Sequence, residues 1–218
     1  MKILKLNNWP HEIEYHEDWR DIINIVAEAI EETGPWLLNE DTSPEHENIF
    51  KQLKQSLTDK RVCIVGIDPY PNDATGVPFE SKDFSKKTIK AIAENISAIY
   101  RVSLYRNYNF LLVEGVLVWN YYLSCRKGET KSHRIFWENL ANVFINHIAG
   151  YISIFYFLGK SDFTNINSSL NSPITTIVGY HPAARNNQFS EEYTFEIINA
   201  LLEFKEQDKI NWIQGFVY

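Results

Sequence analysis

The chain has 218 residues, of which 44% are hydrophobic, and its 28 acidic and 21 basic side chains give a formal net charge of −7. This composition excludes a disordered chain, and the acidic balance argues against a protein that clamps nucleic acid by its overall charge, although it leaves room for a local positive groove. The longest apolar run, residues 151–158, is too short to span a membrane.

Length, the lysines near the start and cysteine content set three further expectations. A chain of this size fits one α/β domain over residues 1–218. Lysines interrupt the apolar residues near the start, so we expect no signal peptide. The two cysteines, Cys63 and Cys125, are too few for a disulfide framework, which predicts a reducing, intracellular compartment.

The N-terminal third predicts one strand and one helix. Residues 1–18 indicate a short strand and an irregular arm, and residues 19–33 have the apolar spacing of an amphipathic helix. We expect the pair Gly34 and Pro35 to stop this helix. Residues 41–44 predict a loop that enters a helix, with Thr42 or Ser43 able to cap it.

The most informative stretch is RVCIVGIDPYP, residues 61–71. Residues 62–65 are apolar and mostly β-branched, which predicts a short buried strand. Two prolines then stiffen the chain, so that Asp68 and Tyr70 lie on a rigid loop beyond the carboxyl end of this strand. Open α/β sheets bind their ligands at that edge. A plain surface turn is the alternative, because Asp-Pro turns are common.

The rest of the chain alternates between helices and strands. The predicted elements are a helix over residues 85–99, a strand over 115–122, a helix starting at Ser132, strands over 152–158 and 173–178, and a last helix starting at Ser190. This alternation predicts an α/β fold with three layers, α/β/α, around a mainly parallel sheet. Because parallel strands end at one edge, we expect Asp68, Asn120, Gly159 and His181 to gather in one cleft.

Five segments resemble motifs of the family 1 uracil-DNA glycosylases, in the order of that family. They are GIDPYP at residues 66–71, GVPF at 76–79, VLVWN at 116–120, SH at 132–133 with Trp137, and GYHPAAR at 179–185. The segments TGVPFES, GETKSH and NWIQGF are similar to the poxvirus branch of the family. The chain is therefore identified as a member of this family, and the resemblance implies its fold.

The resemblance also implies the chemistry. It implies a hydrolase that flips uracil out of DNA and breaks its N-glycosidic bond without a metal or a cofactor. Asp68 would stabilise the sugar cation and orient the attacking water, and His181 would donate a hydrogen bond to uracil O2. The implied substrate-binding residues are Ile67, Tyr70, Phe79 and Asn120. From the residues alone, Asn120 is more simply a strand-end residue bonded to its own backbone, and Phe79 is a core aromatic.

The expected partner of this chemistry is DNA, single- or double-stranded and containing uracil. The residues that the resemblance assigns to DNA binding are Ser43, Pro44, Gly159, Lys160 and Arg185. For Ser43 and Pro44 a plain helix entry is an equal alternative. Three positions depart from the family pattern, because Pro71 replaces a His, Ala183 a Ser and Arg185 a Leu; these changes concern DNA affinity and flipping rather than the chemistry.

Poxvirus members of the family also join a partner protein that holds the replicative polymerase on DNA. The resemblance thus implies a second role in a viral processivity factor, in the cytoplasm of the infected host cell. The predicted partner surface is residues 167–173, with Asn167 and Pro173, together with the aromatic residues of the C-terminal end. The alternative is that these aromatics close the core, which we favour for Trp212.

Three other possibilities are left open or disfavoured at this stage. A mainly non-catalytic DNA-binding scaffold is the alternative function, and a homodimer is left open. A hydrolase that uses Asp68 as a covalent nucleophile on phosphate is disfavoured, since we find neither a carboxylate set for Mg²⁺ nor a phosphate cradle in the sequence.

Overall fold

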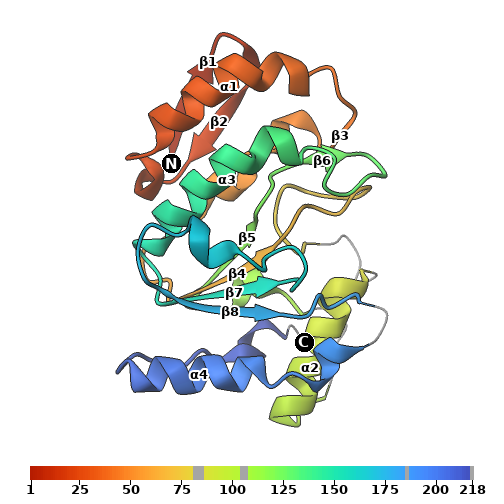
Figure 1. Ribbon diagram of the computed structural model, residues 1–218, viewed down its shortest axis with the longest axis vertical. Helices are drawn as coiled ribbons and strands as arrows, with labels where there is room; N and C mark the ends of the chain where they lie inside the picture. Colours follow the sequence, from red (N-terminus) through yellow and green to blue (C-terminus); the bar gives the residue numbers. More distant parts are fainter. Residues whose placement is uncertain (81–85, 104–107, 185–186, 217–218) are drawn as a thin grey trace.

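A four-stranded parallel sheet forms the centre of the computed structural model, which describes residues 1–80, 86–103, 108–184 and 187–216 (Figure 1). The strands are β4 (Val62–Gly66), β5 (Val116–Asn120), β7 (Ile154–Leu158) and β8 (Thr175–Gly179), and their order in the sheet is β5-β4-β7-β8. The predicted mainly parallel sheet is confirmed.

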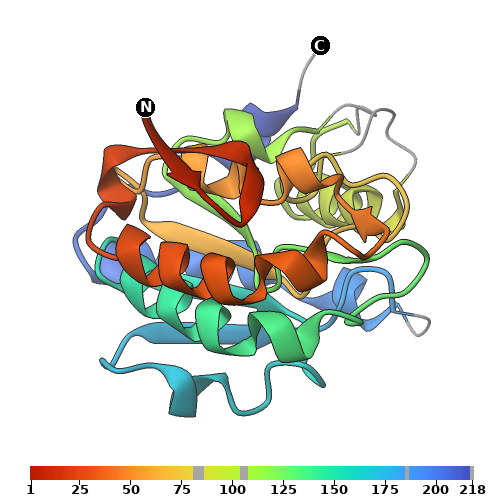
Figure 2. The same cartoon turned by 90° about the horizontal axis from the view of Figure 1, so that it is seen from above.

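Helices cover both faces of this sheet. Helices α1 (Ile23–Leu37) and α3 (Arg134–Ala149) pack on one face and run side by side (Figure 2). Helices α2 (Lys87–Tyr100) and α4 (Thr194–Phe204) pack on the other (Figure 1). The three-layer α/β/α prediction is therefore confirmed.

The central strand β4 shows why the sequence folds in this way. All five of its residues are buried. Val62 and Ile64 point toward α2 and α4, whereas Cys63 and Val65 point toward α1 and α3. A strand that is covered on both faces reads as an unbroken apolar run, which is the pattern of residues 62–65.

The N-terminal region departs from its prediction. Strands β1 (Lys2–Leu6) and β2 (Trp9–Tyr15) form an antiparallel hairpin in place of one strand and an irregular arm. The first helix begins at Ile23 rather than at residue 19, because Trp19 belongs to a short 3-10 turn, Glu17–Trp19. Trp19 is fully buried and stacks on Trp119 with ring centroids 5.1 Å apart.

The predicted stop at Gly34 and Pro35 is wrong, since α1 continues to Leu37 with Pro35 inside it. A proline in a helix leaves the carbonyl four residues earlier without its backbone donor. That carbonyl belongs to Glu31, and the side-chain amide of Asn8 donates to it at 2.9 Å. The β-hairpin thus supplies the hydrogen bond that Pro35 removes.

Two predicted helix starts are also wrong. The Ser132 hydroxyl does not cap α3; it donates to the Glu129 carbonyl and accepts from the Arg126 N–H. Helix α4 starts at Thr194 and not at Ser190. Residues Gln188–Glu191 form a 3-10 turn instead, and the Asn95 side chain holds carbonyls of this segment.

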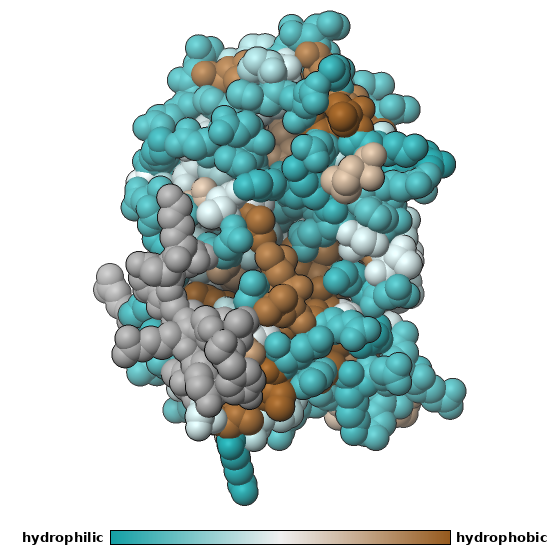
Figure 3. Space-filling model, turned by 180° about the vertical axis from the view of Figure 1, so that it is seen from behind, coloured by the Kyte–Doolittle hydropathy of each residue, from teal (hydrophilic) through white to brown (hydrophobic). Residues whose placement is uncertain are grey.

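The last feature of the fold concerns its surface. Hydrophilic residues cover most of the face in Figure 3, and hydrophobic residues are visible mainly in a band through its centre. Within the described residues, no helix combines the length and the hydrophobicity needed to cross a membrane.

The predicted helix start at Ser85 lies outside the described residues; α2 is described from Lys87.

Candidate active site

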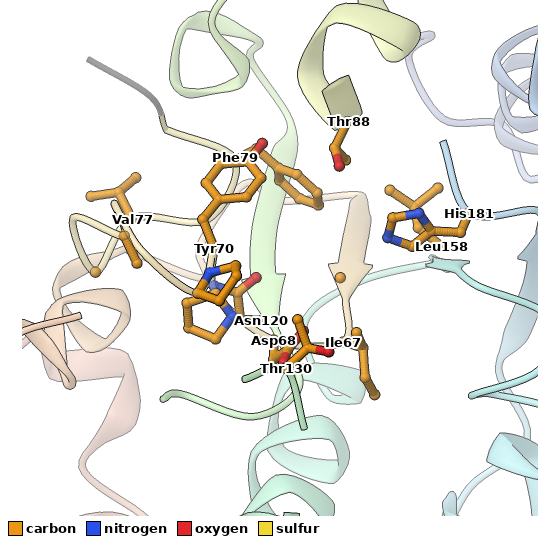
Figure 4. A pocket seen from close by; sticks show the side chains of 15 residues that line it. Ile67, Asp68, Tyr70, Val77, Phe79, Thr88, Asn120, Thr130, Leu158 and His181 are labelled. Carbon is orange, nitrogen blue, oxygen red and sulfur yellow. The ribbon is translucent and has the colours of Figure 1, made fainter. Parts of the chain in front are cut away.

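A cavity of about 200 Å³ lies at the carboxyl edge of the sheet, where the strands end (Figure 4). Asp68, Asn120 and His181 all line it, as the strand-end argument predicts. The contribution from β7 is Leu158 rather than the neighbouring Gly159. The other lining residues are Gly66, Ile67, Pro69, Tyr70, Pro71, Ala74, Gly76, Val77, Phe79, Thr88 and Thr130.

The wall of the cavity is formed by Asn120 and Phe79 around Gly66. Asn120 lies opposite Gly66 in the β4–β5 pair. A Cβ at position 66 would lie 3.3 Å from Asn120 Oδ1 and 3.3 Å from Phe79 Cζ. The missing side chain therefore lets the carboxamide and the ring approach each other above the end of β4.

The Asn120 side chain is buried and has no hydrogen-bond partner among the described residues. Asn120 is only 4% exposed, and its backbone N–H donates to Gln52 Oε1 at 2.6 Å. Its carboxamide bonds to no other residue in the described part of the chain, its own backbone included. A polar group that is buried without a partner costs free energy unless a ligand satisfies it. Asn120 is therefore not a self-bonded strand end, and its carboxamide is available to a ligand in the cavity.

The carboxyl group of Asp68 lies on the loop after β4 and accepts a hydrogen bond from the backbone N–H of Lys131 at 2.6 Å. Burial raises the pKa of Asp68 to about 6, against the opposing effects of the Lys131 N–H and its positive charge. The nearby carboxylate of Asp162 adds to the rise in this pKa. Asp68 is thus mostly ionised at pH 7 and above.

His181 follows β8 and faces Asp68 across the cavity (Figure 4). Its Nδ1 accepts the backbone N–H of Ala183 at 3.1 Å. Burial lowers the pKa of the His181 imidazole, although the carboxylate of Asp162 acts in the opposite direction. A neutral ring whose Nδ1 accepts a hydrogen bond carries its proton on Nε2, so His181 offers a donor and no charge.

Two sequence comparisons agree on the family. The model of the uracil DNA glycosylase superfamily matches residues 54–203. The uracil-DNA glycosylase of fowlpox virus (strain NVSL) is 76% identical over 216 residues, which cover 99% of this chain and 99% of that protein.

The chain belongs to the uracil DNA glycosylase superfamily. Both the predicted enzyme class, a DNA glycosylase, and the resemblance to the poxvirus branch are confirmed.

Solved structures of more distant relatives share the fold of this glycosylase. The mimivirus uracil-DNA glycosylase has a TM-score of 0.71 at 16% identity, and the match covers 92% of this chain and 87% of that one. The UNG of Nitratifractor salsuginis has a TM-score of 0.60 at 16% identity, covering 86% and 90%. At this identity the likeness supports the fold alone.

Tyr70 and Phe79 give the glycosylase cavity its aromatic walls. Burial raises the pKa of the Tyr70 hydroxyl to about 12, against the effects of the Thr88 side chain and the Ile89 backbone. The Phe79 backbone has a φ of 62°, which turns the chain into the cavity, and its ring packs 5.5 Å from that of Phe110. Gly76 permits this turn, because a Cβ there would lie 2.1 Å from the Asn48 carbonyl oxygen.

Ser43 and Pro44, which we assign to DNA binding from the sequence, are buried in the glycosylase. The Ser43 hydroxyl donates to the Tyr70 carbonyl at 2.7 Å, so it does not cap a helix. It holds the loop that carries Tyr70 and Asp68. A contact of these residues with the DNA backbone stays a prediction.

Gly159 and Lys160 form the loop after β7, beside the cavity. Lys160 is exposed, and its Nζ lies 3.6 Å from the centroid of the Tyr180 ring. This contact places a positive charge next to the loop that carries His181. Arg185, the remaining residue predicted to bind DNA, lies outside the described residues.

The predicted partner surface is only half exposed. Asn167 and Pro173 are exposed, whereas Trp212 is 1% and Phe216 6% exposed. The two aromatics therefore close the core with α2 and α4. The core position that we favour for Trp212 is confirmed, whereas the assignment of Phe216 to a partner surface is wrong. Tyr218 lies outside the described residues.

Sequence reasoning missed several residues of the site. Thr88 and Leu158 line the cavity from α2 and β7, and neither belongs to a segment quoted for the family. Thr130 and Lys131 lie within the GETKSH segment, yet their types alone indicate no role. Lys131 acts on Asp68 through its backbone N–H, which every residue except proline carries, so its identity gave no signal.

Proposed function

We propose that this glycosylase flips uracil out of DNA, holds it between Asp68, Asn120 and His181, and hydrolyses its bond to deoxyribose. The observation that carries the proposal is the buried Asn120 carboxamide, which faces the cavity without a partner among the described residues. The match with the fowlpox virus uracil-DNA glycosylase supports the same substrate.

The Asn120 carboxamide fits uracil by its hydrogen-bonding pattern. Uracil presents an N3–H donor and an O4 acceptor, and a carboxamide offers the matching acceptor and donor. Cytosine has the reverse pattern at these atoms and would leave buried polar groups unpaired. A site built on such hydrogen bonds discriminates by factors of roughly 10⁴ or more.

Tyr70 and Phe79 account for two further properties of the pocket, which are the exclusion of thymine and the stacking on the base. Thymine differs from uracil by a C5 methyl group, and excluding it requires a stiff wall. Tyr70 supplies that wall, because Pro69 and Pro71 restrict its backbone and Ser43 holds its carbonyl. Phe79 stacks on the base, an interaction worth roughly 1–3 kcal/mol.

Asp68 and His181 act on the two charges that develop as the bond breaks. The sugar becomes positive, and the ionised Asp68 stabilises it and orients the water whose oxygen bonds to C1′. The uracil leaves with the bonding electrons, and negative charge builds up on O2. The Nε2–H of His181 donates a hydrogen bond to O2, a preorganised donor of the kind that supplies a large catalytic effect.

Uracil release from single- and double-stranded oligonucleotides tests this proposal. We expect free uracil and an abasic site in the presence of a metal chelator, and no release from matched strands with cytosine or thymine at the same position. Failure to release uracil from either substrate would overturn the proposed function.

A second role, as a component of a viral processivity factor, is favoured by exposed residues far from the cavity. Asn167 and Pro173 precede β8 and are exposed, and α4 exposes Ile197 at 49% and Phe204 at 87%. The start of β8 and the C-terminal end of α4 lie on the same side of the molecule (Figure 1). Exposed apolar residues of this kind suit a protein partner. Such a role implies work in the cytoplasm of the infected cell.

Two variants separate this role from catalysis. Asp68→Asn should still support long-stretch DNA synthesis with the polymerase and its partner, although it releases no uracil. Pro173→Asp should lose processive synthesis and keep uracil release. If the folded Asp68→Asn protein also abolished processive synthesis, the two roles would not be separable and the second proposal would fail.

A further inference from the structure

The two catalytic loops are not neighbours in the sheet. Asp68 follows β4 and His181 follows β8, and β7 lies between these strands. The strand pairing therefore fixes the Asp68 loop relative to the His181 loop only through β7. The distance between a carboxylate and a hydrogen-bond donor that act on one substrate must be held closely, because a misplacement of 1 Å can cost a factor of about 100 in rate.

Lys131 ties the Asp68 loop to the segment before α3. Its backbone N–H donates to Asp68 Oδ2 at 2.6 Å. Its φ of 61° lies in the left-handed region, which is costly for a residue with a side chain. Its ammonium group forms an ion pair with the carboxylate of Asp162, so that one residue is held at both ends.

Asp162 continues the connection to the His181 loop. Its backbone N–H donates to the Gly159 carbonyl at 3.1 Å, and the Gly159 N–H donates to the Gly179 carbonyl at 3.0 Å. Gly179 is two residues before His181. Gly159 has a φ of 137°, and a Cβ there would lie 3.3 Å from Asp162 Oδ2. The positive φ of Gly159 and the short distance to the Asp162 carboxylate both favour glycine at position 159.

The ion pair also lines a cavity next to that of Asp68 and His181. Thr130 lines the cavity of Asp68 and His181, and the next residue, Lys131, lines a separate cavity of about 410 Å³ together with Asp162. Ile67 lines both cavities. The two cavities therefore meet at Ile67 and at residues 130–131, and the ion pair lies on the far side of this boundary from the active site.

We propose that Lys131 and Asp162 are positioning residues for uracil excision, and that their ion pair is a latch holding the Asp68 loop and the His181 loop at a fixed separation. This inference rests on the proposed function, because it assigns the latch to the two groups that act on uracil. Neither residue lines the cavity of Asp68 and His181, so both act through other groups.

The latch has an electrostatic consequence that a purely structural contact would lack. The positive charge of Lys131 lowers the pKa values of both Asp68 and His181, and the negative charge of Asp162 raises both. As an intact pair the two charges oppose each other. Removing one of them exposes both catalytic groups to the charge that is left.

The other ionisable groups facing Asp68 do not carry charge at neutral pH. Burial raises the pKa values of the Cys125 thiol, to about 12, and of the Tyr122 hydroxyl, so both are neutral. His181, across the cavity, is also neutral because burial lowers the pKa of its imidazole. Lys131 and Asp162 are therefore the charged residues that act on Asp68 in the described part of the chain.

The test compares Lys131→Met, Asp162→Asn and the double variant. Lys131→Met removes a positive charge and should raise the pKa of Asp68, so the acid limb of the kcat/KM profile should move to higher pH. Asp162→Asn removes a negative charge and should lower this pKa, so the limb should move to lower pH. The double variant should lie between them. Each single variant should lose at least about tenfold in kcat with a smaller change in KM, because the loops are no longer held.

The matched control is Lys209→Met, which breaks an exposed ion pair with Glu203 at 3.0 Å on and beside α4. It should change neither the pH profile nor kcat. An NMR titration of His181 provides a readout independent of turnover, and its pKa should rise in Lys131→Met and fall in Asp162→Asn. Should Lys131→Met fail to fold, Lys131→Gln takes its place.

The outcomes separate the two proposals. Suppose that the wild-type protein releases uracil, but that the acid limb and the His181 pKa either stay unchanged in both single variants or move in the same direction. This result would overturn the latch and leave the proposed function intact. Equal losses in the Lys209→Met control overturn it as well. A wild-type protein that releases no uracil overturns the proposed function, and the latch with it.

Discussion

Gly66 and Asn120 lie opposite each other in the β4–β5 pair, and a Cβ on Gly66 would come within 3.3 Å of Asn120 Oδ1. The same Cβ would lie 3.3 Å from the Phe79 ring. One missing methyl group therefore sets the width of the cavity between Asn120, which we propose to bind the base edge, and the Phe79 ring, which we propose to stack on its face.

Gly66→Ala should narrow this gap and impair uracil binding. We expect kcat/KM for uracil release to fall by about tenfold or more, while the free energy of unfolding falls by no more than about 1–3 kcal/mol, since Gly66 has no positive φ to strain and the added methyl group only crowds its neighbours. Steady-state kinetics and urea unfolding measure both quantities. Gly150→Ala, at the end of α3 and away from the cavity, is the control; a similar loss there would refute the argument.

The pH dependence of uracil release should report Asp68. The ionised carboxylate is the active form, and the pKa of Asp68 is raised to about 6. The rate should therefore decrease as the pH is lowered through about 6. For an exposed aspartate the same decrease would occur about two pH units lower. A profile of kcat/KM against pH checks this. A rate that stays constant down to pH 4.5 would exclude ionised Asp68 as the essential group.

Asp68→Asn should lose activity by orders of magnitude and gain stability at pH 7.5. The folded pKa of Asp68 lies above its usual value of 3.8, so the native state is weakened as the pH rises from about 4 through 6. Asparagine removes this penalty and can still accept the Lys131 N–H. The gain should be roughly 1–3 kcal/mol and should vanish near pH 3.5. Thermal unfolding at both pH values measures it, and an equal gain at both would contradict the assignment.

Specificity should divide between two residues. Asn120→Asp should let the pocket accept cytosine, because a protonated carboxyl can match the cytosine pattern. Tyr70→Ala should admit thymine by removing the wall against its methyl group. Base release from oligonucleotides carrying uracil, cytosine or thymine tests both variants. Loss of activity on every base, with no new substrate for either variant, would count against this division.

Lys160 should contact a DNA phosphate. Lys160→Gln should weaken DNA binding and reduce the slope of log affinity against log salt concentration by about one contact, with little change in the bond-breaking step. Fluorescence anisotropy over a series of salt concentrations measures the slope. Lys209→Gln, on the exposed Lys209–Glu203 pair, is the control. An unchanged slope for Lys160→Gln would place Lys160 off the DNA.

The sequence was most informative where one local pattern decides the structure. The apolar run before Gly66 predicted a buried strand, and two prolines predicted a stiff loop, because both effects act within a few residues. The gathering of Asp68, Asn120 and His181 also followed, since parallel strands end at one edge. None of these arguments needs a contact between distant side chains.

The misjudged features depend on distant partners. Pro35 breaks a helix unless another group bonds the freed carbonyl, and here that group is Asn8, 23 residues before Glu31. Ser132 resembles a helix cap until its hydroxyl is taken by Arg126 and Glu129. Lys131 reaches Asp68 through a backbone amide that any residue but proline would offer. Composition and periodicity carry no trace of such pairings.

The late position of β8 in the chain sets a time order for the protein during its synthesis. Asp68 follows β4 and Asn120 ends β5, and a ribosome makes both strands early, whereas the strand leading to His181 is made more than a hundred residues after Asp68. Until β8 joins β7, the loop of His181 has no fixed place. The hydrogen-bond donor proposed to act on the leaving base is therefore added only with the last fifth of the chain, after Asp68 and Asn120 have both been made.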